Sequence, residues 1–365
     1  MKEKKIDRFF LIIIFFIVII GVIMFTSASL GILVKSSKNF YSALFNQLIL
    51  GLSGGLIGMY FCSKINYKFW RKFSFVIFLL SICITALVFV PHLGWSHGGA
   101  RRWIELGRFS FQPVEILKFG FIIYFAAWLS WVKNKVQDFR FGILPFMIMS
   151  LVIAIILFKQ PDTKSFILIV LTGISMLFIS GVSIKYILGV GVAIVLVLGT
   201  LLFFKPYLQE RVKTFINPSQ NSQGSSYQIQ QSLIALGSGG IFGRGLGQSI
   251  QKFSYLPEPQ GDSIFAVLGE ELGFVGALGT IFLYLLFALR GFRIANNSPD
   301  LFSRLLVSGI VIMITVQSFM HIASIIGVFP LTGVPLPFMS LGGTSLMIYL
   351  MSIGIVFQVS KFNRN

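Results

Sequence analysis

The chain has 365 residues, of which 55% are hydrophobic and 40 are phenylalanine, and its mean hydropathy is +0.86. Such a chain has too little polar surface to cover a soluble globule, so we expect a polytopic membrane protein. The formal net charge is +18, but short basic clusters between apolar runs indicate membrane topology and no nucleic-acid partner. Cys62 and Cys83 lack metal-ligand spacing.

Ten apolar runs are long enough to span a bilayer. They lie at about 9–29, 43–62, 71–90, 113–132, 141–158, 164–181, 184–204, 263–289, 302–323 and 341–360. The first run exceeds a typical signal-peptide core, so we interpret it as an uncleaved span. An even number of spans puts both termini on one side, and more than half of the Lys and Arg then fall in that side's loops, which predicts cytoplasmic termini.

The expected fold is therefore all-α and polytopic, a single domain over 1–365. A long extracellular loop, residues 205–262, lies between helices seven and eight. Short basic loops on the inside suit anionic lipid headgroups. Because the long loop and the loop at 91–112 both face outward on this topology, we expect the function at the outer face.

The loop at 91–112 contains Arg101, Arg102 and Trp103. Trp and Arg are common anchors at a membrane interface. Adjacent arginines also offer planar, permanently charged forks for phosphate oxygens. Both interpretations stay open.

The fourth span opens with Pro113, and Glu115 and Lys118 follow on one helix face, one turn apart. One interpretation is a self-neutralising buried pair. The other is a lysine presented to an anionic ligand and held in place by the glutamate.

Two further outer segments are rich in glycine or proline. Residues 226–240 predict a helix, and the glycine-dense turn 237–249 lacks the spacing of a nucleotide-binding loop, so we interpret it as re-entrant. Residues 329–345 hold three prolines and three glycines. Backbone broken at membrane depth is tolerated beside a cavity, which this segment predicts nearby.

Three acids lie at the end of the long loop and in the apolar run after it. Asp262 lies where the loop becomes a helix, and Glu270 and Glu271 lie inside the apolar run. Ionisable groups there are functional candidates by default. Pairing with a basic group is the simpler account of the two glutamates, and at most one of them is expected to face Asp262.

A lone acid with cations suits transfer of a group from a lipid-borne phosphate ester. The acid, Asp262, takes a proton from an attacking hydroxyl. Cations stabilise the departing pyrophosphate, with Lys118, Arg101 and Arg102 as first candidates and Arg244 and Lys252 as weaker ones. A divalent cation, Mg²⁺ or Mn²⁺, could share this role, although the sequence identifies no ligands for it.

Residues 99–119, 227–276 and 330–347 resemble the SEDS family (shape, elongation, division and sporulation) of FtsW, RodA and SpoVE, and the FtsW type more than the RodA type. The resemblance implies a peptidoglycan glycosyltransferase that polymerises lipid II at the outer face of the bacterial cytoplasmic membrane. It also implies a class B penicillin-binding protein of the FtsI type and divisome proteins as partners, and a location at the division septum.

The resemblance also carries residue roles. The family's essential aspartate corresponds to Asp262, and its Glu and Lys correspond to Glu115 and Lys118. We expect Asp262 as general base, Lys118 on phosphate or sugar with Glu115 orienting it, and Arg101 and Arg102 near the pyrophosphate. Glu258 is a lesser candidate, for loop positioning. The chain departs from the family pattern at Gln260-Gly261 and at 162–165, which read Asp-Thr-Lys-Ser.

Three alternatives remain: a lipid II flippase or other transporter, a scaffold that only recruits the penicillin-binding protein, and a RodA-like elongation polymerase. The charges lie at the outer ends of helices and the sequence shows no inverted repeat, which disfavours a transporter. A scaffold would leave Asp262 without a role.

Overall fold

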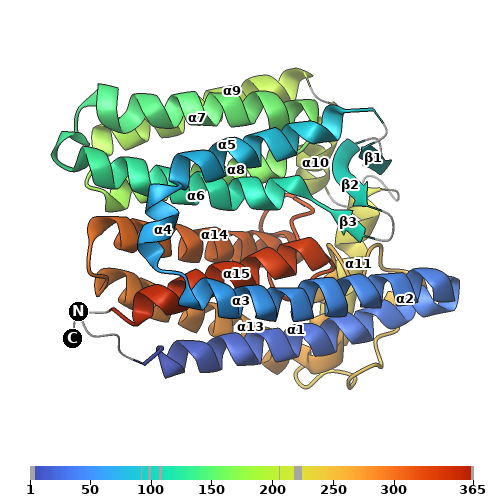
Figure 1. Ribbon diagram of the computed structural model, residues 1–365. Coiled ribbons are helices and arrows are strands. Elements are labelled where there is room, and N and C mark those ends of the chain that lie inside the picture. Colours follow the sequence, from blue (N-terminus) through green and yellow to red (C-terminus); the bar gives the residue numbers. More distant parts are fainter. Residues whose placement is uncertain are drawn as a thin grey trace.

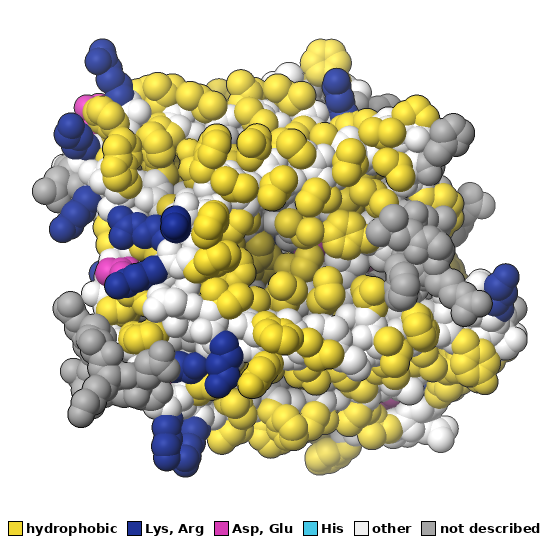
Figure 2. All heavy atoms as spheres, viewed as in Figure 1, with side chains coloured by type: hydrophobic (Ala, Val, Ile, Leu, Met, Phe, Trp, Pro, Cys, Tyr) yellow, Lys and Arg dark blue, Asp and Glu magenta, His cyan; other side chains and the backbone are white. Residues whose placement is uncertain are grey.

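A computed structural model describes residues 5–91, 93–97, 100–106, 109–204, 206–217 and 224–362. Its helices run side by side along one axis (Figure 1). The start of the first helix and the end of the last lie together, where the backbone N–H of Asp7 donates to Ser360 Oγ at 3.3 Å. Hydrophobic side chains cover the length of the face shown in Figure 2, while Lys and Arg gather mainly at that same end. This pattern is typical of a bundle embedded in a bilayer.

Within the described residues, eight helices are long and apolar enough to cross a membrane. They are α1 (Arg8–Lys35); α2 (Ser37–Phe45) continued through the π-helical η1 (Asn46–Ser53) into α3 (Gly54–Lys64); α6 (Pro113–Val132); α7 (Phe139–Lys159); α9 (Ile184–Phe204); α13 (Ile264–Asn296); α14 (Leu301–Ile325); and α15 (Gly343–Ser360). Two shorter apolar helices, α5 (Ser74–Ala86) with η2 (Leu87–Phe89) and α8 (Thr163–Ile179), occupy the other two expected positions. The helical membrane fold is confirmed, and the count of ten spans stays a prediction.

The centre of the bundle is formed by α14 and α15, whose apolar windows are mostly buried. α6 and α8 pack against α14, and α3 packs along α15. Two short helices, α4 (Tyr67–Lys72) and η3 (Lys133–Lys135), connect spans at the basic end.

The loop expected at 91–112 contains a three-stranded antiparallel sheet, which departs from the all-α expectation. Its strands are β1 (Gly94–His97), β2 (Ala100–Leu106) and β3 (Phe109–Phe111), in the order β1-β2-β3. Trp95 is paired with Trp103, and Ile104 with Phe111, and such aromatic and β-branched residues suit cross-strand contacts. The register shifts between Trp95 and Ser96, so Arg101 and Arg102 lie at an irregularity of β2 opposite Ser96.

The long outer loop is also more structured than expected. The helix expected at 226–240 is present as α11 (Ser225–Ser238). A second helix, α10 (Pro206–Ile216), was not predicted, and α12 (Gln251–Ser254) adds one turn before the acids. α10, α11 and the sheet lie at the end of the bundle opposite the basic end (Figure 1).

The eighth span is broken at Gly273, although the sequence predicted one continuous helix at 263–289. Gly273 has φ 69° and ψ −167°, which is not helical. At 1.5 Å per residue, the 33 residues of α13 would form an unbroken helix of about 50 Å, far longer than a bilayer core. The break separates a buried segment, 264–272, from a spanning segment, 274–296.

The glycine-dense turn replaces the hydrogen bonds that the break removes. The carbonyls of Glu270 and Glu271 accept from the N–H groups of Arg244 and Gly245, both at 3.0 Å. Beyond the break, the N–H groups of residues 274 and 275 donate to the carbonyls of residues 240 and 241 at 2.9 and 3.1 Å. These N–H groups are used inside the fold, so the turn stabilises a helix break, and its re-entrant character stays a prediction.

Candidate functional site

Asp262 lies at the wall of a polar cavity of about 110 Å³, at the end of the bundle that carries the sheet. α6, α8, β2 and the Pro-rich segment before α15 supply the other walls. The charged residues that line it are Arg102, Glu115, Lys118, Lys164 and Asp262. Three cations against two carboxylates give the cavity a net positive charge, which suits an anionic ligand.

The size of the cavity limits what it can hold. At about 110 Å³, the cavity has room for several waters or a small polar group. A large substrate would place its reacting part there and extend beyond the cavity.

Glu115 and Lys118 meet on one face of α6, in its first two turns. Their side chains form an ion pair of 2.8 Å, and each is 2% exposed. Lys118 Nζ also donates to Gln317 Oε1 at 3.2 Å and to the Tyr349 hydroxyl at 3.5 Å. The second carboxylate oxygen, Glu115 Oε2, is buried and has no hydrogen-bond partner within the described part of the chain.

The two adjacent arginines differ in position. Arg102 lines the cavity, and its guanidinium binds the end of α7: Nε donates to the Gln160 carbonyl at 3.1 Å and Nη2 to the Pro161 carbonyl. Arg101 is exposed and is not among the described residues that line the cavity. The structure thus brings Arg102 to Asp262's cavity and leaves Arg101 outside it.

A tight turn presents Asp262 to the cavity. The Glu258 carbonyl accepts from the N–H groups of Gly261 at 3.0 Å and Ser263 at 3.2 Å. Glu258 has φ 45°, and its exposed side chain accepts from Gln260. Its side chain is not among the described cavity-lining groups, so Glu258 shapes the turn through its backbone. Substrate binding by Glu258 stays a prediction.

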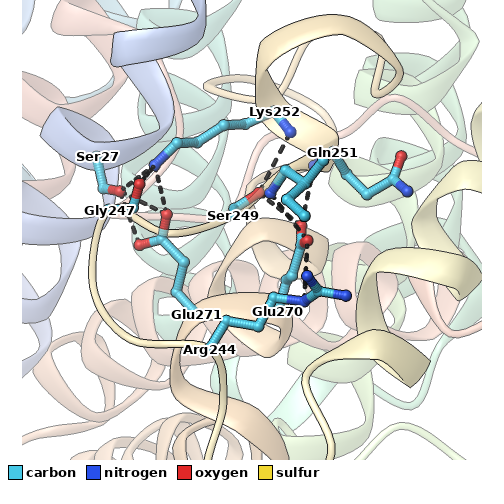
Figure 3. Close-up of polar contacts among 9 residues, drawn as sticks. Ser27, Arg244, Gly247, Ser249, Gln251, Lys252, Glu270 and Glu271 are labelled. Atoms are coloured by element: carbon cyan, nitrogen blue, oxygen red, sulfur yellow. Dashed lines mark hydrogen bonds and ion pairs between the residues drawn. The ribbon is translucent and has the colours of Figure 1, made fainter.

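Glu270 and Glu271 are not among the described residues that line this cavity, and both are fully buried. Lys252 Nζ forms a 2.6 Å ion pair with Glu271, and Ser27 of α1 donates to the same carboxylate at 2.7 Å (Figure 3). Glu270 accepts from the backbone N–H of Ile250 at 3.0 Å, and Arg244 lies 3.6 Å from it. Pairing with basic groups, the simpler account, is therefore correct. Arg244 and Lys252 serve these acids and lie outside the described lining of the cavity.

Sequence reasoning missed several residues of the site. Lys164, in the first turn of α8, lines the cavity, although the sequence marked it only as a departure from the family pattern. Gln317 and His321 are buried polar residues one turn apart in an apolar span, which is itself a functional signal. Arg211 lies on α10, the helix that was not predicted, so no pattern pointed to it.

Among these residues, a metal ion would find few ligands. Within the described residues, no group of three or more His, Cys, Asp or Glu side chains is placed to hold one. Mg²⁺ often binds one or two protein carboxylates and takes its remaining ligands from water and substrate phosphates, and the carboxylates that line this cavity are Glu115 and Asp262.

Comparison with known proteins agrees with this architecture. The family model described as cell cycle protein, FTSW_RODA_SPOVE, matches residues 7–365. Stage V sporulation protein E of Bacillus subtilis is 37% identical over 364 residues, covering 100% of this chain and 99% of that protein. A probable peptidoglycan glycosyltransferase FtsW of a Geobacter species is 37% identical over 363 residues, covering 98% of each chain.

Solved structures share the fold along the whole chain. A chain of a peptidoglycan synthase complex, described as coordinating polymerization and crosslinking, superposes with a TM-score of 0.79 at 27% identity and covers 97% of both chains. The rod shape determining protein RodA of Thermus thermophilus superposes with a TM-score of 0.70 at 23% identity, covering 99% of this chain and 98% of that one, which shows the fold alone. This chain is a multi-pass membrane protein that belongs to the FtsW/RodA/SpoVE family, the SEDS family that its motifs indicated.

Proposed function

We propose that this chain is a peptidoglycan glycosyltransferase that polymerises lipid II into glycan strands at the outer face of the bacterial cytoplasmic membrane. The observation that carries the proposal is the single cavity that brings Asp262 together with Arg102, Lys118 and Lys164. Relatives named as peptidoglycan glycosyltransferases and the likeness to a peptidoglycan synthase complex support it.

The reaction needs a base at the acceptor hydroxyl and cations at the leaving pyrophosphate. The 4-hydroxyl of the acceptor attacks the anomeric carbon of the donor, and Asp262 takes the hydroxyl proton as the new glycosidic bond forms. The bond between the anomeric carbon and the pyrophosphate breaks, and undecaprenyl pyrophosphate leaves with the bonding electrons. A placed base typically contributes about 10²- to 10⁴-fold.

The cations act on the leaving group. Lys118, held by Glu115, and Arg102, held by the end of α7, bind the pyrophosphate or the sugar beside it. Preorganised donors of this kind are worth about 10²- to 10³-fold each. A divalent cation held by Asp262 and Glu115 would add a Lewis acid at the same phosphates. Every proton transfer above needs only the chain's own residues.

The proposal also includes the partner protein, the orientation in the membrane and the location in the cell. A class B penicillin-binding protein would crosslink the strands that this chain makes, in line with the synthase complex that coordinates polymerization and crosslinking. We place the termini in the cytoplasm because Lys and Arg gather at that end of the bundle. The FtsW-like sequence favours a role in septal synthesis with divisome proteins over elongation.

One experiment tests the activity. The purified protein, with and without a class B penicillin-binding protein, is given lipid II, and glycan polymer is separated on a gel. We expect polymer from the wild type and none from Asp262→Asn. Asp138→Asn is the matched control, because Asp138 is an exposed helix cap that asparagine replaces well. If lipid II crosses liposome bilayers and no polymer forms, the chain is a flippase and the proposal is wrong.

A further inference from the structure

Four consecutive carbonyls next to Asp262 are each bound by a side chain from another element. The segment is Thr332–Pro335, and we call it the strap. In chain order, its carbonyls accept from Arg211 Nη1 at 3.0 Å, from Lys164 Nζ, from His321 Nδ1 at 2.7 Å and from Gln317 Nε2 at 2.9 Å. These donors come from α10, α8 and α14, so three helices hold one short stretch of backbone.

The strap needs such donors because of its sequence. Residues 330–336 are all described and belong to no helix or strand, and they include Pro330 and Pro335. Buried carbonyls without a regular partner must be satisfied by other groups. Lysine and arginine give charge-assisted hydrogen bonds, which are roughly twice as strong as neutral ones. Two of the four bonds are of this kind, so the strap is fixed more firmly than an ordinary loop.

Gly333 of the strap faces the carboxylate of Asp262. This glycine has φ 63°, and a Cβ built on it would lie 2.9 Å from Asp262 Oδ2 and 3.8 Å from Arg211 Nη2. The adjoining turn is tied to the same region, since Ser340 Oγ donates to the Gly261 carbonyl at 2.7 Å. The backbone angle favours glycine at position 333, and any larger residue there would displace the carboxylate of Asp262.

We propose that the strap positions the carboxylate of Asp262, and that Lys164 and Arg211 are positioning residues that act through it. The inference rests on the proposed function, in which Asp262 is the base. A reacting group misplaced by 1 Å can lose about 10²-fold in rate, so rigid backbone beside the base has a direct effect on turnover. Lys164 and Arg211 also place positive charge beside Asp262, in a setting whose other ionisable groups are Arg102, Glu115, Lys118, Glu258 and His321.

The first test changes the contact with Asp262. Gly333→Ala adds the Cβ that the carboxylate excludes, and we expect kcat to fall about 100-fold with KM changed less than about twofold. Gly181→Ala is the matched control, because Gly181 also has a positive φ, 92°, but no atom within 4 Å of a built Cβ. If the two variants behave alike, backbone strain alone explains the effect and the contact with Asp262 has no role.

The second test removes one anchor of the strap. We expect Lys164→Met to lower kcat about tenfold at unchanged KM, and Lys164→Arg to recover most of the loss because it keeps a charged donor. Lys361→Met is the matched control, since Lys361 Nζ binds the Ser63 carbonyl at 2.8 Å, at the basic end of the bundle. A raised KM with unchanged kcat would instead identify Lys164 as a substrate-binding cation and overturn the proposal.

A third measurement does not depend on activity. Hydrogen–deuterium exchange of peptides covering 258–263 and 332–341 should speed up in Lys164→Met and stay at the wild-type rate in Lys361→Met. An unchanged exchange rate in Lys164→Met would refute the proposal that Lys164 holds the strap in place. If the exchange rates respond as expected but the wild-type protein makes no polymer, the anchoring of the strap is supported and the glycosyltransferase assignment is wrong. Failure of the strap proposal can therefore be told apart from failure of the proposed function.

Discussion

Replacing Lys118 separates the two interpretations of the buried pair in α6. Lys118→Met keeps most of the side-chain length and removes the charge 2.8 Å from Glu115, where both groups are 2% exposed. Breaking a buried ion pair from one side costs about 3–5 kcal/mol, because the remaining charge is uncompensated. We therefore expect a clear fall in the thermal midpoint of the single variant, whether or not Lys118 touches substrate.

The double variant Glu115→Gln with Lys118→Met gives the decisive comparison. It leaves no unpaired charge, so most of the lost stability should return. Activity should not return if Lys118 binds phosphate or sugar, and we expect polymerisation to stay about 10²- to 10³-fold below wild type. Thermal unfolding in detergent measures the stability, and polymer formed from lipid II measures the activity.

A matched pair elsewhere calibrates the result. Arg290 and Asp7 also lie 2.8 Å apart, but they are 27% and 12% exposed, so Arg290→Met should cost less stability than Lys118→Met. If the double variant in α6 polymerises lipid II at the wild-type rate, the pair is only structural. The assignment of Lys118 to substrate would then be refuted.

Three further predictions follow from the site. Arg102→Ala should reduce polymerisation more than Arg101→Ala, since only Arg102 is among the described cavity-lining residues, and the comparison of kcat/KM for the two variants checks this. Lys252→Met should lower the thermal midpoint strongly and Lys252→Met with Glu271→Gln should recover it, because the 2.6 Å pair is fully buried; equal midpoints for the single and double variants would contradict this. Removal of divalent cations with EDTA should lower polymerisation and Mg²⁺ or Mn²⁺ should restore it, and full activity in EDTA would remove the divalent cation from the proposal.

Much of the architecture could be predicted from hydropathy. Apolar runs located the spans, and charges next to prolines located Asp262, Glu115 and Lys118. These signals are local, because a lipid-facing helix must be apolar and a charge inside it is costly wherever it lies. The difference in position between Arg101 and Arg102 depends on the register shift in the sheet that carries them. It was missed because the sheet itself was not expected.

The break at Gly273 could not be predicted in this way. The run around it is continuously apolar, and a glycine within a helix is a weak signal. What makes the break stable is the turn around residues 240–245, about thirty residues earlier, whose backbone supplies the missing hydrogen bonds. The strap raises the same difficulty, because its donors Lys164, Arg211 and His321 come from three separate helices. Contacts of this kind between distant segments leave no periodic pattern in the sequence.

The two buried glutamates gain a role once the break is known. Asp262 lies just before the short segment 264–272, and Glu270 and Glu271 lie near the far end of that segment. There the glycine-dense turn, Lys252 and Ser27 of α1 fix it. The strap fixes the near end, through Gly333 beside Asp262. A nine-residue helix is too short to be stable alone, so its position depends on these anchors. Charges that take no part in the reaction can thus control how precisely Asp262 is placed. We therefore expect Lys252→Met to lower turnover more than Arg290→Met does. Neither side chain is among the described residues that line the cavity, so a difference between the two variants would reflect the placement of Asp262.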